Sequence, residues 1–354
     1  MATSADKLNE ALAFIGRDAT TREEITRSLH VFEERTTYSG SLRDEVTGVV
    51  FDALYRDAGL LQKRVQSGLV FEFYHTSKIT RDFILSTPET PDHVWEPQTT
   101  RLLLYLAQHT HNVVIGGAYF GDQALLVAQQ LAAHHGVCHA FEPNSHNFKL
   151  LVRNAESNGL THVVRPHQLG LWNEITHLHL VGDDAYAFSA PTEETAEDGF
   201  ATTTIDAYAR QQGIENQIGL IMLDTEGGEL RALQGAEQHL ALPAGQAPHL
   251  VFEVHRHYVD WTNGLNNTEV LQFLMAHGYK VFAVRDYQSN QATSHLPIEL
   301  IPPQDTYLEG PPHGFNMLAV KDETVIQNDL FRIRHHVSPK LLLHKDPALH
   351  HPLP

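Results

Sequence analysis

Residues 112–122 read NVVIGGAYFGD, and residues 137–143 read VCHAFEP. Each is a short β-rich run, and each ends in residues suited to a ligand, first a glycine turn and then a carboxylate. The segment between the two runs, residues 121–135, has apolar residues at helical spacing. The order strand, helix, strand predicts a parallel βαβ unit with a right-handed crossover. In such a sheet the ligand binds at the carboxyl ends of the strands.

The same alternation of strand-like and helix-like segments continues to about residue 320. Further strands are expected at 161–171, 176–182, 218–224, 248–255, 279–284 and 315–320, and helices at 145–159, 228–242 and 267–278. Strands joined by helices predict an α/β fold, with a Rossmann-like, mostly parallel sheet covered by helices on both faces.

The segments on either side of this region do not show the alternation of strand-like and helix-like runs. Residues 1–95 are predicted to form a helical N-terminal extension, because Val46, Val49, Val50 and Leu54 recur at helical spacing. We expect this extension to be a lid or an oligomerisation element, and residues 96–322 to form the main domain. Residues 323–354 form a His- and Pro-rich tail. An acidic surface loop is expected at 183–201, with Glu193, Glu194, Glu197 and Asp198.

Composition excludes several classes of partner. The formal charge of −18 argues against nucleic acid, which needs a basic protein surface, and against anionic membranes. Cys138 is the single cysteine, so an internal disulfide or a thiolate metal cluster is excluded. The first residues, MATSADKLNE, lack the basic and apolar regions of a signal peptide, so we expect a cytoplasmic protein. A small-molecule partner remains, and a homo-oligomer is compatible with this composition.

The glycine turn and the next strand end together predict a nucleotide-type cofactor. Gly116, Ala118 and Gly121 imitate the G-x-G/A-x-x-G pattern, in which small residues let the backbone approach a ligand. Glu142 follows about 20 residues later, where a carboxylate accepts hydrogen bonds from ribose hydroxyls. S-adenosylmethionine and NAD fit this pattern equally well.

Several further motifs follow in a fixed order. They are FEPNSHNFKLLVRNAESNGL (141–160), QLGLWNE (168–174), TTTIDAYA (202–209), LIMLDTEGGELRALQGAEQHL (220–240), PHLVFEVH (248–255) and LMAHGYKVF (274–282). Over residues 95–320, including Trp95-Glu96-Pro97, this succession resembles the FkbM-type methyltransferases, a branch of the class I S-adenosylmethionine-dependent family. The resemblance implies a seven-stranded sheet, S-adenosylmethionine as cofactor, and a hydroxyl of a natural product or sugar as methyl acceptor.

The resemblance also implies where the cofactor contacts lie. The glycine turn would surround the methionine part, Glu142 would hold the ribose, and the segment from Gln168 to Trp172 would lie beside the adenine. The chain departs from the family at Ile115, where an acidic residue is usual, and at Tyr119, where asparagine is usual. Asp122 or Glu96 could supply the missing carboxylate. The candidate cofactor residues are Glu96, Gly116, Gly117, Ala118, Tyr119, Gly121, Asp122, Glu142, Pro143, Asn144, Gln168, Leu169, Gly170, Trp172 and Asp224.

Candidate catalytic residues follow the next two strands. Asp224 is expected to contact the methionine end or the acceptor, and Glu226 to form part of the acceptor wall or to cap the following helix. His255 is the candidate general base, since a neutral imidazole titrates near the working pH. We expect Glu253, on the same strand face, to orient it.

Two other functions and one other cofactor stay open at this point. Asp224, Glu226, Glu253 and His255 could bind magnesium, although the chemistry does not require it. An NAD-dependent oxidoreductase would use the same glycine turn and Glu142. A catalytically degenerate methyltransferase fold that serves as a binding module is the non-enzymatic alternative.

Overall fold

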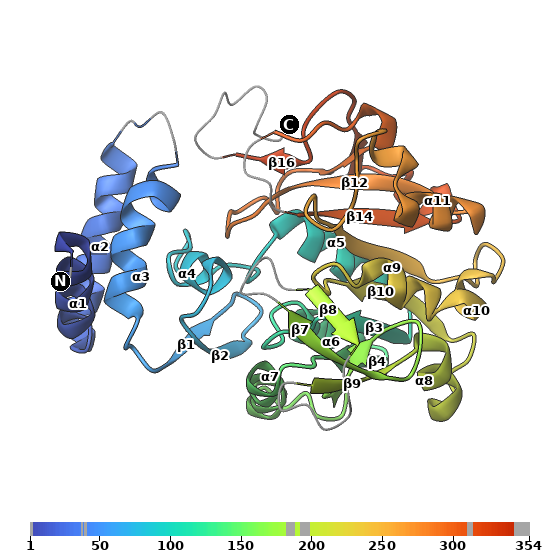
Figure 1. Ribbon diagram of the computed structural model, residues 1–354, viewed down its shortest axis with the longest axis horizontal. Helices are drawn as coiled ribbons and strands as arrows, with labels where there is room; N and C mark the ends of the chain where they lie inside the picture. The colour runs from blue at the N-terminus through green and yellow to red at the C-terminus, as the bar shows by residue number, and fades with distance from the viewer. Residues whose placement is uncertain are drawn as a thin grey trace.

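The computed structural model describes residues 3–36, 38, 41–181, 188–191, 199–309 and 314–342. A large sheet forms its centre (Figure 1). Seven neighbouring strands of this sheet are, in spatial order, β5 (Val164–His167), β4 (Val137–Phe141), β3 (Asn112–Gly116), β10 (Ile218–Leu223), β11 (His249–Val254), β14 (Phe315–Val320) and β12 (Lys280–Tyr287). The first five are mutually parallel, and β14 is antiparallel to both of its neighbours. The predicted α/β class with a mostly parallel sheet is confirmed.

The sheet is wider than the seven strands expected. It continues through β13 (Ile298–Ile301) and β15 (Phe331–Ile333), and β16 (Lys340–Leu341) pairs with the end of β12. Residues 331–341 were expected to belong to a tail, yet they add two strands to the main sheet. The pairing of β16 places Lys340 beside Asp286.

Helices cover both faces of the sheet. One face carries α5 (Pro97–Ala107), α6 (Ala124–Ala132) and α7 (Ser145–Ser157), and the other carries α8 (Ile205–Gln212), α9 (Glu229–Gln234), α10 (Glu237–Leu240) and α11 (Glu269–Ala276). Short helical turns are η3 (Leu265–Asn267), η4 (Pro303–Asp305) and η5 (Glu323–Ile326). Because side chains alternate along a strand, Val113 and Ile115 enter the first apolar core and Val114 enters the second.

A second, smaller sheet joins β6 (Gly170–Leu171), β9 (Gly199–Thr203), β7 (His177–Val181) and β8 (Phe188–Pro191), in that order. The strand expected at 176–182 is confirmed as β7. The acidic residues Glu193, Glu194, Glu197 and Asp198 of the expected surface loop lie outside the described residues.

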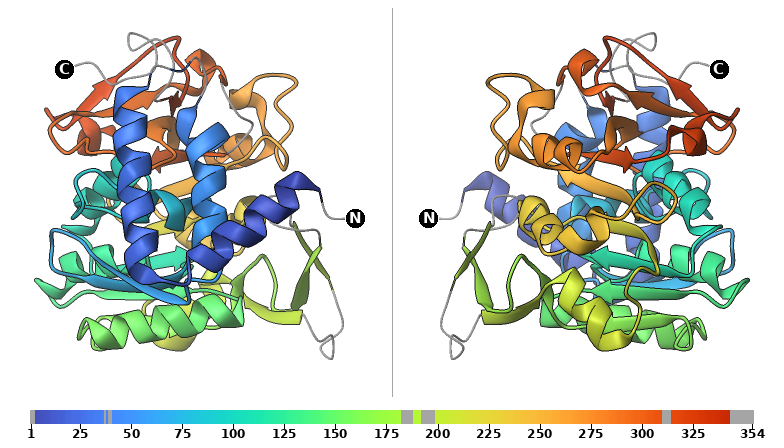
Figure 2. Two further views of the ribbon diagram at one scale, coloured as in Figure 1. Left: turned by 90° about the vertical axis from the view of Figure 1, so that its left-hand side faces the viewer. Right: turned by 90° about the vertical axis from the view of Figure 1, so that its right-hand side faces the viewer.

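The N-terminal region begins with helices, as expected. These are α1 (Ser4–Ile15), α2 (Ala19–Arg35), the π-helical turn η1 (Arg43–Thr47), α3 (Gly48–Tyr55) and, later, α4 (Lys78–Ile84). Figures 1 and 2 show α1–α3 stacked together at one end of the molecule, with α4 between them and the sheet. No helix in the described part of the chain combines the length and the apolar character that a membrane crossing needs.

The expectation that residues 1–95 are helical throughout is wrong for one segment. Residues between α3 and α4 form an antiparallel hairpin of β1 (Leu60–Arg64) and β2 (Val70–Tyr74). The outer edge of β2 is held by two side chains of the α7 region. Asn158 and Asn154 each exchange a pair of hydrogen bonds with the backbone of β2, at Val70 (2.8 and 2.8 Å) and Glu72 (2.7 and 2.9 Å). These amides replace a third strand, which is why the hairpin is stable.

A buried hydrogen-bonded chain lies between β4, β5 and α8. The hydroxyl of Tyr208 lies 2.7 Å from His139 Nδ1 and 2.7 Å from His167 Nε2, and His139 Nε2 lies 3.1 Å from Asn112 Oδ1. Burial, together with the nearby His167 and Arg165, lowers the pKa of His139 to about 4. His139 is therefore neutral in the folded protein near neutral pH.

Because His139 is neutral in the folded protein, the free energy of unfolding depends on pH. Between the ordinary histidine pKa of 6.5 and the folded value of about 4, the unfolded chain binds a proton that the folded chain does not. Stability from His139 is thus lost as pH falls. Relative to His139→Gln, the wild type is expected to lose about 2 kcal/mol of unfolding free energy from about pH 7 to about pH 5. Urea titrations of both proteins measure this difference, and parallel pH profiles would contradict it.

Candidate functional site

The glycine turn after β3 lies where the strand order reverses, with β4 on one side of β3 and β10 on the other. The N–H groups of Gly117 and Ala118 both donate to the carbonyl of Phe141 (3.0 and 2.9 Å). Gly117 has φ +78°, and a Cβ built on it would lie 1.7 Å from the carbonyl oxygen of Asp224. Only glycine fits here, because the backbones after β3 and β10 touch.

The two departures from the family pattern have structural consequences. Ile115 is buried in the sheet between Met222 and Ala140, so an apolar residue packs where the family has an acid. Tyr119 adopts the left-handed backbone conformation at φ +47°, a region that asparagine tolerates better than tyrosine. Its N–H donates to Glu142 Oε2 (2.8 Å), which holds the turn against the end of β4.

Glu142 connects the turn to the next helix. Its Oε1 accepts from the N–H of Asn144 (2.8 Å), and Asn144 in turn caps α7 by accepting from the N–H groups of His146 and Asn147. Burial raises the pKa of Glu142 to about 7, although the two N–H donors oppose the rise. A carboxylate oxygen has room for a second hydrogen bond, so Glu142 can still accept from a ligand hydroxyl.

Five carboxyl groups from five different segments lie near enough beside the turn to interact electrostatically with at least one other member of the group. Burial is the main cause that raises the pKa of each, to about 7 for Asp122, about 6 for Asp224 and Asp286, and well above the usual range for Glu96 and Glu253. The charges of Asp224 and Asp286 raise the pKa of Glu96 further. Such a cluster is destabilising in itself, and a cation would relieve it.

Backbone and amide donors hold two of these groups. The N–H groups of Gln98 and Thr99, in the first turn of α5, donate to the Asp286 carboxylate at 3.0 and 2.7 Å. Glu96, immediately before this helix, accepts from Asn316 Nδ2 at 2.7 Å. The amino end of α5 and the start of β14 thus meet at the cluster.

The loop after β10 supplies the rim of the site. Glu229, the first residue of α9, closes this loop by accepting from the N–H and hydroxyl of Thr225 (2.8 and 3.0 Å). At the helix N-cap, Gly228, the structure shows no side-chain cap hydrogen bond. Glu226 is exposed, at φ +50°. Burial and then the charge of Glu226 raise the pKa of Tyr258, whose ring packs over Gly227.

His255 follows β11 and belongs to a group of rings. It stacks on His257 with ring centres 4.8 Å apart and lies 5.1 Å from the Tyr258 ring. Its Nδ1 accepts from the backbone N–H of His257 at 3.1 Å. The neutral ring therefore carries its proton on Nε2 and is a donor on that side.

The segment expected beside the adenine follows β5. Leu171 contacts Gly116, since a Cβ on this glycine would lie 2.9 Å from Leu171 Cδ1. The backbone N–H of Trp172 donates to the backbone carbonyl of Thr203 (3.0 Å), and the half-buried Trp172 ring lies 3.2 Å from the position of a Cβ on Gly228. The segment, with Gln168, Leu169, Gly170 and Trp172, therefore borders both the glycine turn and the loop after β10.

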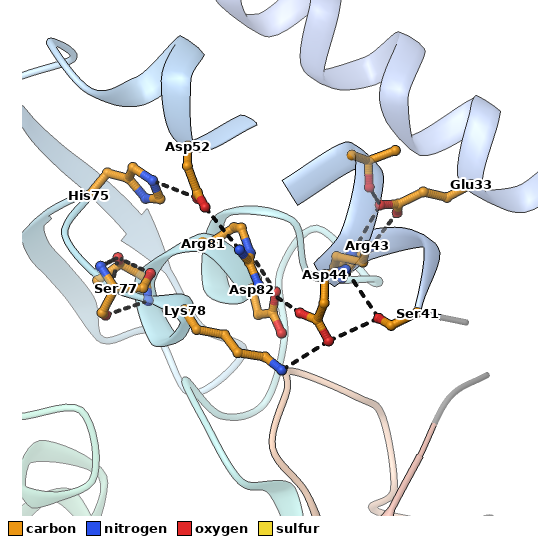
Figure 3. A network of polar contacts seen from close by, with 12 residues as sticks. Glu33, Ser41, Arg43, Asp44, Asp52, His75, Ser77, Lys78, Arg81 and Asp82 are labelled. Atoms are coloured by element: carbon orange, nitrogen blue, oxygen red, sulfur yellow. Dashed lines mark hydrogen bonds and ion pairs between the residues drawn. The ribbon is translucent and has the colours of Figure 1, made fainter. Parts of the chain in front are cut away.

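A polar network ties the N-terminal helices to α4 (Figure 3). Arg81 on α4 donates to Asp44 (2.8 Å) and to Asp52 (3.0 Å), and Lys78 lies 3.2 Å from Asp44. At the amino end of α4, the hydroxyl of Ser77 lies 3.2 Å from that of Tyr119. A continuous set of contacts thus runs from α2 and α3 to the glycine turn.

The sequence indicated some of these residues and missed others. Asp286, Asn316 and Lys340 were not expected at the site, although a polar Asn316 inside the apolar run FNMLAV was a usable signal. No group of three or more His, Cys, Asp or Glu side chains in the described residues is arranged to hold a metal ion. Magnesium therefore has no support.

Solved structures resemble the chain at low identity. A methyltransferase FkbM from Methylobacillus flagellatus KT has a TM-score of 0.38 and 13% identity, over 59% of this chain and 43% of its own. This chain thus spans less than half of that protein. An O-methyltransferase from Bacillus cereus in complex with SAH gives 0.34 and 14%, over 70% and 91% of the two chains. TYW2 from M. jannaschii in complex with AdoMet gives 0.35 and 12%, over 73% and 84%.

Sequence comparison gives a more specific result. No curated protein matches the chain. The family model of the methyltransferase FkbM domain matches residues 116–281, from the glycine turn to the start of β12. This match confirms the resemblance predicted from the sequence: residues 116–281 are similar to the FkbM domain of methyltransferases.

Proposed function

We propose that the chain is an S-adenosylmethionine-dependent methyltransferase that methylates a hydroxyl oxygen of a small molecule. The observation that carries the proposal, beside the family match, is a group of carboxyl side chains in which Glu96, Asp122 and Asp286 are buried and Asp224 and Glu253 are half-buried. When bound, the cofactor supplies an electrophilic methyl group on a positively charged sulfonium. A group of carboxylates favours a cationic ligand, whereas it would repel the pyrophosphate of NAD.

The glycine turn and its neighbours fit this cofactor. Gly117 leaves no room for a side chain, so the backbone itself would border the ligand. Glu142 would accept from the ribose hydroxyls, and Trp172 would lie beside the base. Asp224 and Asp122 would face the positive end, in place of the acidic residue that Ile115 replaces.

Removing the methyl acceptor's proton needs a base in the site. Asp224 is our first candidate, since its pKa of about 6 leaves it ionised near neutral pH. His255 is the second candidate, but its Nδ1 already accepts from His257, so a proton could enter there only after that contact breaks. In the present geometry His255 is better suited to orient the acceptor as a donor. Glu226 would form part of the acceptor wall.

The cofactor is tested by thermal stability. S-adenosylhomocysteine and S-adenosylmethionine are expected to raise the melting temperature, and NAD to leave it unchanged. Stabilisation by NAD alone would support the oxidoreductase instead. Turnover is then tested by following S-adenosylhomocysteine over a set of hydroxylated metabolites. Binding without turnover across a broad set would favour the non-enzymatic binding module.

Glu142→Ala is expected to weaken S-adenosylhomocysteine binding by about 1–3 kcal/mol, because the ribose and the N–H groups of Tyr119 and Asn144 lose a charged acceptor. Calorimetric titration measures the change. Glu156→Ala, which removes an exposed carboxylate from α7, is the matched control and should bind as the wild type does. An unchanged dissociation constant for Glu142→Ala would remove Glu142 from the site.

We further propose that residues 1–95 act as a lid over the acceptor. The link between Tyr119 and Ser77, together with the contacts of Arg81, supports this role. Tyr119→Phe removes only the hydroxyl, and we expect cofactor affinity to stay the same while turnover falls about tenfold as the lid loses its contact. Steady-state kinetics and calorimetry on one preparation measure both quantities. Unchanged turnover would refute the lid contact.

A further inference from the structure

Only one of the two polar atoms in the Asn316 side chain has a hydrogen-bond partner among the residues that the structure describes. Its side chain is buried, with 2% exposure, and its Nδ2 donates to Glu96 Oε2 at 2.7 Å. Its Oδ1 has no hydrogen-bond partner among the residues that the structure describes. A buried acceptor without a donor is destabilising. Its position beside carboxyl groups indicates that a donor arrives with a ligand.

The groups around this oxygen are mainly acceptors. Glu253 pairs with Asn316 across β11 and β14, so both side chains leave the same face of the sheet. Glu96 is bound to the Asn316 amide and is repelled by Asp224 and Asp286. Among the described cations, Lys340 lies close enough to Glu253 for the two charges to attract each other, and Lys78 repels Lys340. Lys78 is bound to Asp44, at 3.2 Å.

We propose that Glu96, Glu253 and Asn316 form a subsite for a primary ammonium group of a small-molecule ligand. An ammonium offers three N–H donors and one positive charge, which match an amide oxygen between two carboxylates. The proposal rests on the proposed function, and two molecules could bring the group. One is the cofactor through its amino-acid end, and the other is the methyl acceptor.

The carboxyl groups add a pH dependence. Burial raises the pKa of Glu96 and of Glu253 well above the usual range, so burial favours the protonated form of both groups. An ammonium would displace these protons, so its affinity should rise with pH. Asp122, Asp224, Asp286, Lys78 and Lys340 act on the same pocket, and the variants below are therefore compared at one pH.

The test uses two nucleosides and two variants. S-adenosylhomocysteine carries the amino-acid end, and 5′-methylthioadenosine has the same nucleoside without it. Glu96→Gln removes one charge and keeps the shape, and Asn316→Leu removes the orphaned oxygen. Glu215→Gln, an exposed carboxylate just before the amino end of β10, is the control. Calorimetry measures both nucleosides on all four proteins.

If the cofactor brings the ammonium, both variants lose about 10–100-fold in affinity for S-adenosylhomocysteine and keep their affinity for methylthioadenosine. If the acceptor brings it, both nucleosides bind all proteins equally. Methylammonium chloride then raises the melting temperature of the nucleoside-saturated wild type above that in sodium chloride of equal ionic strength, and does not do so in the two variants. Either result supports the subsite.

Two results overturn it. Equal losses for both nucleosides mean that Glu96 and Asn316 support the fold of the site rather than an amino group. No change with either nucleoside, together with no effect of methylammonium on the wild type, leaves no ammonium subsite. If the wild type binds neither nucleoside, the proposed function fails, and the methylammonium test on the ligand-free protein still decides the subsite.

Discussion

Gly117→Ala is expected to reduce cofactor affinity by at least about 100-fold and to abolish detectable turnover. Two costs combine at this position. Alanine at φ +78° is strained by about 1–2 kcal/mol. Its Cβ would also lie 1.7 Å from the Asp224 carbonyl oxygen, so the backbones after β3 and β10 must separate. Because both border the proposed cofactor site, the separation should damage binding more than stability.

Gly159→Ala separates the two costs. Gly159 follows α7 at φ +67°, with no atom within 4 Å of an added Cβ. It should therefore show the backbone strain alone, as a loss of stability of about 1 kcal/mol with normal cofactor affinity. Calorimetry and urea titration of both variants make the comparison. Normal cofactor affinity in Gly117→Ala would mean that the ligand lies elsewhere.

Asp224→Asn is expected to lower the maximal rate by about 10²–10⁴-fold with little change in acceptor KM, because the amide cannot accept the acceptor's proton. A base with a pKa of about 6 works only when ionised, so the wild-type rate should fall as pH falls through about 6. This loss of rate at acid pH, the acid limb of the pH profile, should disappear in the variant. The pH dependence of the rate for both proteins measures this.

His255→Ala is the matched variant for the competing assignment. If Asp224 is the base, His255→Ala keeps the acid limb and loses less rate than Asp224→Asn. If His255 is the base, the acid limb disappears in His255→Ala and persists in Asp224→Asn, which would refute our assignment. A folded Asp224→Asn enzyme that keeps the full rate would also refute the assignment of Asp224 as the base.

Local patterns were enough to predict the centre of the fold. The alternation from Asn112 to Phe141 has its own periodicity, and the glycine turn has its own chemistry, so both were visible in the sequence. The hairpin at 60–74 was missed because the backbone of β2 is satisfied by Asn154 and Asn158, which lie more than 80 residues away. Propensity within a short window does not contain such a contact.

The site was predicted unevenly for the same reason. Asp224 and Glu142 directly follow the parallel strands β10 and β4, which flank β3. The carboxyl ends of parallel strands lie at one edge of a sheet, so the location of both residues beside the glycine turn could be expected. Asn316 and Lys340 arrive through β14, which inserts between β11 and β12, and through β16, which comes from the expected tail. We expected Glu253 to orient His255, and the sequence did not indicate that the backbone N–H of His257 donates to His255 Nδ1. That contact depends on the geometry of the local turn.

The amides that complete the hairpin also bear on how the protein behaves in a concentrated solution. An open strand edge offers N–H and carbonyl groups to a strand of another molecule, which is a common start of aggregation. At β2 those groups on Val70 and Glu72 are already bound by Asn158 and Asn154. Asn154 of α7 and Asn158 at its C-cap thus keep this edge of β2 from pairing with a strand of a second chain.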